Sequence, residues 1–170
     1  MKKWFAPSKP GEIKPIPWLH KDAISYLENL LTPDMNVLEF GAGGSTLWFA
    51  ERVKSVMAFE DNFDWGGIVK KQAPANVRVF TTKGRDLLID SPQVFDLLLI
   101  DGEPVEQRAE WLKVAPRLVK PGGYVVLDNA NRREYAGARE EFAKHATLLH
   151  TVDGNEPPCV NLITEFWRLK

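Results

Sequence analysis

The fold is decided by residues Asn36 to Arg52, which run Asn-Val-Leu-Glu-Phe-Gly-Ala-Gly-Gly-Ser-Thr-Leu-Trp-Phe-Ala-Glu-Arg. Residues 37–40 predict a short strand that leads directly into Gly41, and a helical segment begins at Thr46. Glycine lets the backbone turn tightly where a Cβ would clash, and the first turn of a helix offers unpaired N–H groups to a polar ligand. The stretch therefore predicts a strand, a glycine turn and a helix start that together cradle a nucleotide-type ligand.

The residue before this turn narrows the class of ligand. A dinucleotide site usually ends its first strand with an apolar residue and continues as G-x-G-x-x-G. Here Glu39 stands two residues before Gly41, and Thr46 stands where the third glycine would be. A carboxylate at the end of this strand suits a ligand that carries an ammonium group better than one that carries a pyrophosphate.

Composition and charge exclude several classes of protein. The chain has 170 residues, 44% hydrophobic and 26% charged, as expected of one soluble globular domain. A net charge of −1 does not indicate the basic surface that proteins use to bind nucleic acid. The single cysteine, Cys159, excludes a disulfide framework within the chain and a cysteine-rich zinc site. The longest apolar runs, of which Leu97 to Ile100 is one, are too short to span a bilayer, and no secretory signal is present, so we expect a cytoplasmic protein without a membrane partner.

Strand and helix patterns alternate along the chain. We expect strands at 37–40, 55–59, 77–81, 94–100 and 124–127, and helices at 18–31, 46–52, 61–72, 105–119 and 132–145. Pro116 should kink the fourth of these helices or split off its last turn. Alternation of this kind predicts a doubly wound α/β domain with a mostly parallel sheet. Two final strands, 147–152 and 160–169, have no helix between them and predict an antiparallel hairpin at the edge.

Ligands of such sheets bind outside the carboxyl ends of the strands. Polar side chains stand at four of the predicted strand ends and should converge on one rim: Glu39, Glu60, Asp101, and Asp128 with Asn129.

Residues 1–17 form a separate N-terminal arm rich in prolines and aromatic groups. So many prolines disfavour a helix interior or a central strand, and the aromatic groups argue against full disorder. We expect an ordered arm that packs on the single domain formed by residues 18–170. Two positions stay open for it, one over the active site as a lid and one on the back of the domain.

The motif Glu39-Phe40-Gly41-Ala42-Gly43-Gly44-Ser45 resembles the first motif of class I S-adenosylmethionine (SAM) methyltransferases, E-x-G-x-G-x-G, with Ser45 in place of the last glycine. The resemblance runs from Trp18 to Lys170, because Phe95–Gly102 and Pro121–Asp128 are similar to the fourth-strand and fifth-strand motifs of that family. It implies a SAM-dependent methyltransferase with a seven-stranded sheet in the order 3-2-1-4-5-7-6.

The same resemblance implies the residues that bind SAM. Glu60 matches the acidic residue that binds both ribose hydroxyls, and Asp86 resembles the one that accepts from the adenine amino group. The full set implied for the cofactor is Glu39, Phe40, Gly41, Ala42, Gly43, Ser45, Thr46, Glu60, Asp61, Asp86 and Asp101.

Asp101, Asp128 and Asn129 resemble the Mg²⁺ ligands of small-molecule O-methyltransferases of the catechol type. Three oxygen donors suit an octahedral hard cation, and such an ion lowers the pKa of a bound hydroxyl. This resemblance implies a small-molecule acceptor that is methylated at oxygen. Asp101, Asp128 and His20 are then the candidate catalytic residues, His20 because the first helix often borders the substrate site in this family. Pro104 stands where the catechol type has a lysine base, which argues against catechol itself.

Other interpretations stay open beside this one. The chain could be a metal-independent N-methyltransferase of the same fold, a SAM-binding module without activity, or a nicotinamide-binding domain, which Glu39 disfavours. Nucleic-acid amino-methylases carry Asp/Asn-Pro-Pro-aromatic after the fourth strand, and its absence argues against a nucleic-acid acceptor. Arg132 and Arg133, just past the fifth strand, are candidates for binding an anionic substrate or are simply solvated at a helix start. Trp65 has two interpretations as well, contact with the adenine or ordinary packing.

Overall fold

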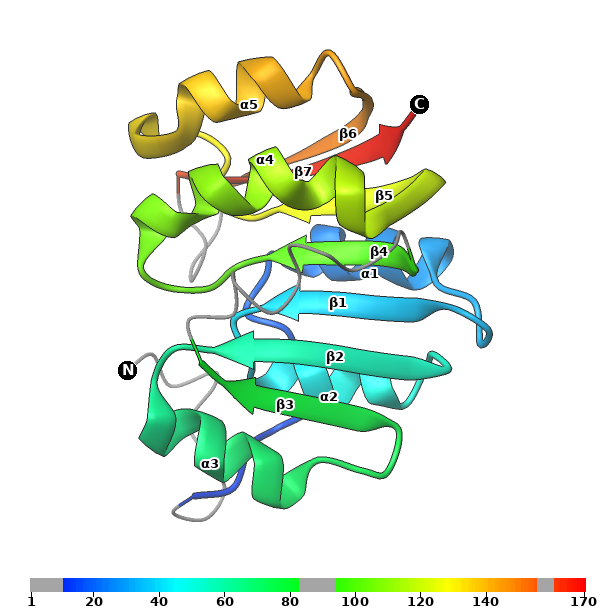
Figure 1. The fold of residues 1–170 in the computed structure, drawn as a ribbon, viewed down its shortest axis with the longest axis vertical. Coiled ribbons are helices and arrows are strands. Elements are labelled where there is room, and N and C mark those ends of the chain that lie inside the picture. The colour runs from blue at the N-terminus through cyan, green and yellow to red at the C-terminus, as the bar shows by residue number, and fades with distance from the viewer. Residues whose placement is uncertain (1–10, 83–93, 156–160) are drawn as a thin grey trace.

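The computed structural model describes residues 11–82, 94–155 and 161–170, which build one seven-stranded sheet in the order β3-β2-β1-β4-β5-β7-β6 (Figure 1). Strands β1 to β5 pair in parallel, and β7 runs antiparallel to both β5 and β6. The predicted sheet order and the C-terminal hairpin are therefore confirmed. The strands are β1 (Asn36–Phe40), β2 (Ser55–Glu60), β3 (Val77–Thr81), β4 (Phe95–Ile100), β5 (Val119–Leu127), β6 (Ala146–Gly154) and β7 (Leu162–Leu169).

Helices cover both faces of the sheet. In Figure 1, α4 and α5 lie in front of the sheet, and α1 and α2 lie behind it. Successive strand residues point to opposite faces, so Leu38 and Leu98 pack with the α4 residue Leu112, whereas Val37 and Leu97 pack with the α1 residue Leu27. The helices are α1 (Lys21–Leu30), α2 (Gly44–Ala50), α3 (Phe63–Gln72), α4 (Arg108–Leu118) and α5 (Ala136–Phe142), with short 3₁₀ turns η3 (Val105–Gln107) and η4 (Arg133–Tyr135).

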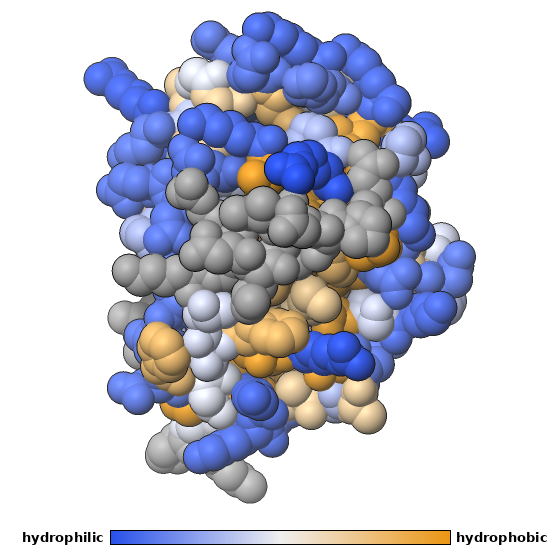
Figure 2. Space-filling view, viewed as in Figure 1, coloured by the Kyte–Doolittle hydropathy of each residue, from blue (hydrophilic) through white to orange (hydrophobic). Residues whose placement is uncertain are grey.

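Polar and apolar surface are unevenly distributed. On the face shown in Figure 2, hydrophilic residues cover the part that holds α4 and α5, and hydrophobic surface shows in the lower half, over β1 to β3. Met57 and Phe80, on β2 and β3, are accordingly only partly buried by the residues that the structure describes. In that part of the chain, no helix is long and apolar enough to cross a membrane.

Several element boundaries differ from the sequence predictions. The fifth strand begins at Val119, not at Tyr124, because the Pro-Gly-Gly segment forms a bulge within the strand instead of a turn before it. Val119 lies opposite Phe95, and Tyr124 lies opposite Leu97, so extra residues loop out between the two pairs. Gly122 adopts a positive φ of 77°, which favours glycine at that point of the bulge.

Four of the five predicted helices are shorter than expected, and two of them begin with a 3₁₀ turn. The helix predicted at 105–119 begins with η3 and continues as α4, and Pro116 lies inside α4 without splitting it. Pro116 stands in the last turn, where few residues remain to be disturbed. The helix predicted at 132–145 is η4 followed by α5, which ends at Phe142. The helix predicted at 46–52 begins two residues earlier, at Gly44, and ends at Ala50.

The described part of the arm, residues 11–17, packs beside the glycine turn. Ile13 is buried in the same cluster as Ala42 of that turn. The Ile13 amide donates to Gln72 Oε1 at 3.0 Å, and Gln72 Nε2 donates to the Gly11 carbonyl at 2.7 Å. The arm is thus attached to the end of α3, and it reaches the turn where the cofactor is predicted to bind.

Candidate functional site

Four neighbouring strands end together at the edge that lies on the left of Figure 1. Backbone hydrogen bonds continue the ladder past the strand ends, from Gly41 N to Phe59 O at 2.8 Å and from Asp101 N to Phe40 O at 3.0 Å. Asp128 N likewise donates to Ile100 O at 3.1 Å. The strand ends therefore converge on one rim, as predicted.

The glycine turn is held by close backbone contacts. Gly41 has a φ of 100°, and a Cβ there would lie 2.6 Å from Gly102 Cα. A Cβ on Gly102 would in turn lie 2.9 Å from Gly41 N. On the other side of the turn, a Cβ on Gly44 would lie 2.4 Å from Ile16 O and 2.6 Å from Lys14 O. Side chains are therefore excluded at these positions by backbone that cannot move aside.

Glu39 is completely buried beneath this turn. Its carboxylate accepts hydrogen bonds from the hydroxyls of Ser45 and Thr46, the latter at 2.5 Å, and Thr46 Oγ1 also accepts from Gly43 N at 2.8 Å. Burial raises the pKa of Glu39 to about 7, although the two hydroxyls act in the opposite direction. Because both oxygens already have donors, Glu39 holds the turn in shape from below and presents no exposed surface to a ligand.

Glu60 lies against the same turn from β2. Its Oε2 accepts from Ala42 N at 3.0 Å, and its Oε1 accepts from Asn62 N at 2.9 Å. Burial raises the pKa of Glu60 above its ordinary value. Trp65 Nε1 donates to Ala42 O at 2.7 Å, which fixes the indole ring beside Gly43. The side chains of Glu60 and Trp65 therefore flank the turn.

Asp61 follows Glu60 directly and is partly buried. Asp86, predicted to bind the adenine, lies outside the described residues.

Asp101 and Asp128 meet at the ends of β4 and β5. Burial, and then the neighbouring Asp128, raise the pKa of Asp101 well above its usual value, and burial raises that of Asp128, so the hydrogen-bonded pair of carboxyl groups shares one proton. Asp128 is buried, and its Oδ1 also accepts from Thr164 Oγ1 at 2.7 Å. Asn129 Nδ2 donates to Asp128 Oδ2 at 2.5 Å, and its Oδ1 accepts from Arg132 Nη2 at 3.1 Å.

Arg108, almost fully buried on α4, ties the two strand ends together. Its guanidinium donates to the carbonyls of Asp101 at 2.8 Å, Gly102 at 3.0 Å and Asp128 at 2.7 Å, and Nη2 lies 3.3 Å from Asp101 Oδ1. A continuous row of five side chains results, Arg108–Asp101–Asp128–Asn129–Arg132, which we call the rim row. One end of the rim row is buried, and the other is partly exposed.

Tyr135 holds the backbone of Asp128 and Asn129 in place at the end of β5. Its hydroxyl donates to the carbonyls of Asp128, at 3.1 Å, and Asn129. Burial raises the pKa of Tyr135 to about 12, so the hydroxyl stays protonated and remains a donor. Asn129 adopts a positive φ of 54°, a conformation that a non-glycine residue keeps where its surroundings enforce it.

His20 was predicted to act beside Asp101 and Asp128, but the structure places it at the start of α1. It lies one residue before α1, and its Nδ1 accepts from Asp22 N at 3.2 Å, so the ring serves as the N-cap of the helix. Nothing in the described geometry brings the imidazole to Asp101 or Asp128. Its predicted catalytic role therefore has no support from the geometry.

The predicted Mg²⁺ ligands come together, but their arrangement does not fit an ion. Both oxygens of Asp128 face protein donors, and Asn129 Oδ1, the oxygen that would bind the metal, faces the Arg132 guanidinium. Asp101 shares a proton with Asp128 and lies beside a second guanidinium, that of Arg108. Cations and N–H groups thus occupy the positions that a hard cation would need. Over the described ranges, no three His, Cys, Asp or Glu residues form a metal-binding group either.

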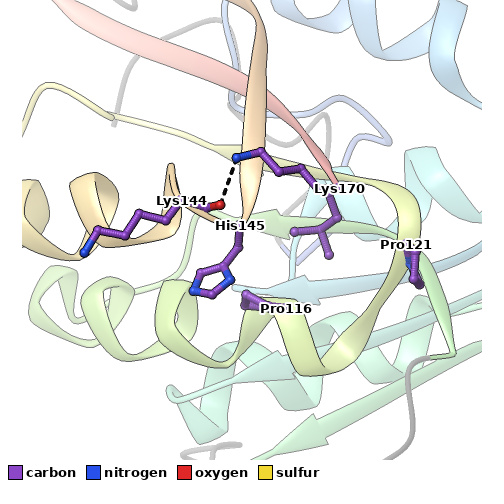
Figure 3. Close-up of a pocket in the computed structure, with 6 residues that line it drawn as sticks. Pro116, Pro121, Lys144, His145 and Lys170 are labelled. Atoms are coloured by element: carbon purple, nitrogen blue, oxygen red, sulfur yellow. Dashed lines mark hydrogen bonds between the residues drawn. The ribbon is translucent and has the colours of Figure 1, made fainter.

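A cavity of about 280 Å³ lies at the opposite edge of the sheet, near the start of β5 and the end of β7 (Figure 3). Lys170 Nζ donates to the Lys144 carbonyl at 2.8 Å, and Lys144 Nζ pairs with Glu141. These lysines are engaged within the protein, and no part of the rim row lines this cavity. It is therefore separate from the candidate site.

Three side chains of the site carried no prediction from the sequence. Arg108 had a usable signal, because it shares the helical spacing of Leu112 and Ala115 on the buried face of the predicted helix. A charged residue on such a face requires partners, and the strand ends supply them. Tyr135 and Thr164 carry no comparable signal, since their contacts depend on how the chain returns to the rim through α5 and β7.

The sheet order, the glycine turn and the acidic strand ends together define a class I SAM-dependent methyltransferase. A family model described as a methyltransferase domain matches residues 38–130, more than half of the chain. The chain belongs to this methyltransferase family. A comparison with curated proteins found no match.

Solved structures of methyltransferases share the fold at low sequence identity. A tRNA (m1A58) methyltransferase, TrmI from Aquifex aeolicus, is 16% identical with a TM-score of 0.70, covering 92% of this chain and 72% of that one. The N-methyltransferase NodS from Bradyrhizobium japonicum WM9 is 15% identical with a TM-score of 0.68, covering 88% and 95%. Precorrin-6y C5,15-methyltransferase from Geobacter metallireducens GS-15 is 19% identical with a TM-score of 0.67, covering 98% and 94%. Their differing acceptors leave the acceptor of this chain to be inferred from its own residues.

Proposed function

We propose that the protein transfers a methyl group from SAM to a hydroxyl oxygen of a small molecule, held between the glycine turn and the rim row. The observation that carries this proposal is the adjacency of two unlike sites on one rim. A turn that excludes side chains adjoins Glu60, and a hydrogen-bonded pair of carboxyl groups lies one strand further on.

The residues at the turn fit the cofactor. Gly41, Gly43 and Gly44 leave the backbone bare, and Glu60 presents a carboxylate suited to ribose hydroxyls. Ser45, Thr46 and Glu39 act beneath the turn by holding its shape. Phe40 lies under it, stacked on Trp111 with ring centroids 4.7 Å apart. Asp61 and Trp65 would border the adenosine, and Asp101 would face the methionine end.

SAM supplies a methyl group on a sulfonium, so that the new C–O bond forms as the C–S bond breaks. The task of the chain is to hold the acceptor in line with that methyl group, which lowers the entropic part of the barrier. Thr164, Asn129 and Asp101 engage three of the four lone-pair sites of the Asp128 carboxylate, and the remaining one would accept a hydrogen bond from the acceptor hydroxyl and take up its proton. The buried partners Arg108 and Tyr135 keep Asp128 in place while this happens.

A nitrogen acceptor is the second candidate, and one observation favours it. The groups predicted to bind Mg²⁺ already face protein donors, so the described residues show no arrangement of ligands for an ion that would acidify a hydroxyl. An amine needs no such ion once it has lost its proton. Turnover of matched hydroxyl and amine compounds, with and without a chelator, separates the two candidates.

The proposal is tested by two substitutions whose effects should differ in kind. Glu60→Ala should abolish SAM binding, measured by calorimetric titration, because it removes the carboxylate beside the turn. Asp128→Ala should leave the SAM dissociation constant within about threefold and lower turnover at least about 100-fold, in the range usual for loss of one acid–base group. Full activity in Asp128→Ala would disprove the assignment of the acceptor site, and unchanged SAM binding in Glu60→Ala would disprove that of the cofactor site.

A further inference from the structure

Arg132 differs from the other arginines in one respect. Four of the arginines that the structure describes are at least partly buried, and three of them pair with a carboxylate. Arg52 pairs with Glu28 at 3.1 Å, Arg108 with Asp101 at 3.3 Å, and Arg139 with Glu165 at 3.1 Å. Within the same described residues, the Arg132 guanidinium forms no such ion pair, although it is also partly buried. Its single side-chain hydrogen bond runs from Nη2 to Asn129 Oδ1.

The position of Arg132 makes this missing counter-charge informative. Arg132 is the outer, partly exposed end of the rim row, next to Asn129 and Asp128. Asn129 engages one of the five N–H groups of the guanidinium, and within residues 11–82, 94–155 and 161–170 no other side chain engages the rest, which can bind a further partner. A planar guanidinium recognises a carboxylate or a phosphate by two parallel hydrogen bonds, which an ammonium group cannot do in the same way.

We propose that the acceptor carries an anionic group, a carboxylate or a phosphate, which Arg132 binds while the methylated atom lies against Asp128. This inference rests on the proposed function, because it names the class of acceptor for the same site. Arg132 is then a binding residue that selects the acceptor, and Asn129 positions it. Neutral compounds with the same reactive group bind poorly, since they leave the partly buried cation without a counter-charge.

Arg133 provides a matched control. It is the next residue and has the same side chain, but it is exposed and lies in η4, beyond the rim row. A general effect of positive charge near the site would change similarly in both variants. Specific recognition by Arg132 would change in one variant only.

The first experiment needs no known acceptor. Arginine Nε–H signals are followed by ¹⁵N NMR in protein saturated with S-adenosylhomocysteine, during titration with sodium acetate or inorganic phosphate at constant ionic strength. One signal, missing in Arg132→Gln and retained in Arg133→Gln, should shift and saturate at millimolar anion. The stronger response tells whether a carboxylate or a phosphate is preferred. The inference is overturned if the Arg132 signal moves no further than those of exposed arginines.

The second experiment uses turnover. Labelled SAM is supplied with pairs of compounds, each an acid and its neutral amide or methyl ester. The acid should be methylated at least about tenfold more efficiently, and Arg132→Gln should remove that preference mainly through KM, with the SAM dissociation constant unchanged. Equal turnover of both members overturns the inference and leaves the proposed function standing. If the unmodified protein does not bind SAM, the proposed function is contradicted instead. If no pair is turned over, the NMR titration alone decides.

Discussion

The two halves of the site are built from different parts of the chain. On the cofactor side, backbone meets backbone, because Gly41 touches Gly102 and Gly44 touches the carbonyls of residues 14 and 16. On the acceptor side, the rim row joins strand ends through side chains. Backbone contacts tolerate almost no change, whereas a row of side chains can be altered one member at a time. The first half can therefore serve one invariant ligand, and the second can be fitted to a particular acceptor.

The largest effect is expected from Gly41→Ala, which tests the backbone half. The new Cβ would lie 2.6 Å from Gly102 Cα, and the φ of 100° is unfavourable for alanine. We expect a loss of about 4 kcal/mol in the free energy of unfolding and no measurable SAM binding. The measurements are urea denaturation and calorimetric titration.

Gly67→Ala is the control for that substitution. A Cβ at Gly67 meets nothing within 4 Å, and the residue lies within helix α3. It should keep SAM binding and leave stability unchanged or raise it by up to about 1 kcal/mol. Similar losses in both variants would show that the backbone contact at Gly41 is unimportant.

A second prediction concerns pH and tests whether Glu39 acts from beneath the turn. Burial raises the pKa of Glu39 from its ordinary value of 4.5 to about 7 in the folded protein. Its contribution to stability is therefore complete below pH 4.5 and is lost as the pH rises through 7, a change of about 3 kcal/mol. In Glu39→Gln, which stays neutral, this part of the pH dependence should disappear. Unfolding free energies at pH 5 and pH 7.5 measure the difference, and equal slopes in both proteins would contradict it.

Arg108→Lys tests the side-chain half from its buried end. Lysine keeps the charge but cannot reach all three carbonyls, so stability should fall by about 2 kcal/mol. Turnover should fall further than in a control, Arg139→Lys, which disturbs a guanidinium paired with Glu165 outside the rim row. SAM affinity should stay within about threefold in both. Equal losses of turnover would show that Arg108 contributes to stability alone.

The smallest effect is expected from Tyr135→Phe. The ring remains in the core, and only the hydroxyl that donates to the carbonyls of Asp128 and Asn129 is lost. Stability should fall by about 1 kcal/mol, the usual net value of one buried hydrogen bond. Amide hydrogen exchange at Asn129 and Ala130 should become faster than at Val126, which lies within the strand. Uniform protection across these amides would show that Tyr135 does not hold the segment that follows β5.

The same division explains what the sequence could reveal. The glycine turn and the acidic residues at the strand ends are local patterns, so Gly41, Glu60, Asp101 and Asp128 could be placed from spacing and resemblance. Sheet order and the terminal hairpin followed from the same motifs. The bulge at Gly122 was not predictable, because Pro-Gly-Gly is equally typical of a turn.

Contacts between distant segments were also beyond the sequence. That Thr164 donates to Asp128, and that Arg132 faces Asn129 Oδ1, depends on the exact return of the chain to the rim. The metal prediction lost its support for this reason, since it used residue types without knowing their neighbours. His20 is a similar case, because a histidine before a helix can cap it as readily as it can act as a base.

The contact between Gly41 and Gly102 has a consequence for how such an enzyme could acquire a new substrate. Strands β1 and β4 are joined at their tips without an intervening side chain, so neither loop can be remodelled without displacing the other. Freedom to diversify is then concentrated where β5 leaves the sheet, from Asn129 to Arg133. Libraries that randomise this short segment, and leave the paired glycines untouched, are the ones from which altered acceptor preference should be recovered.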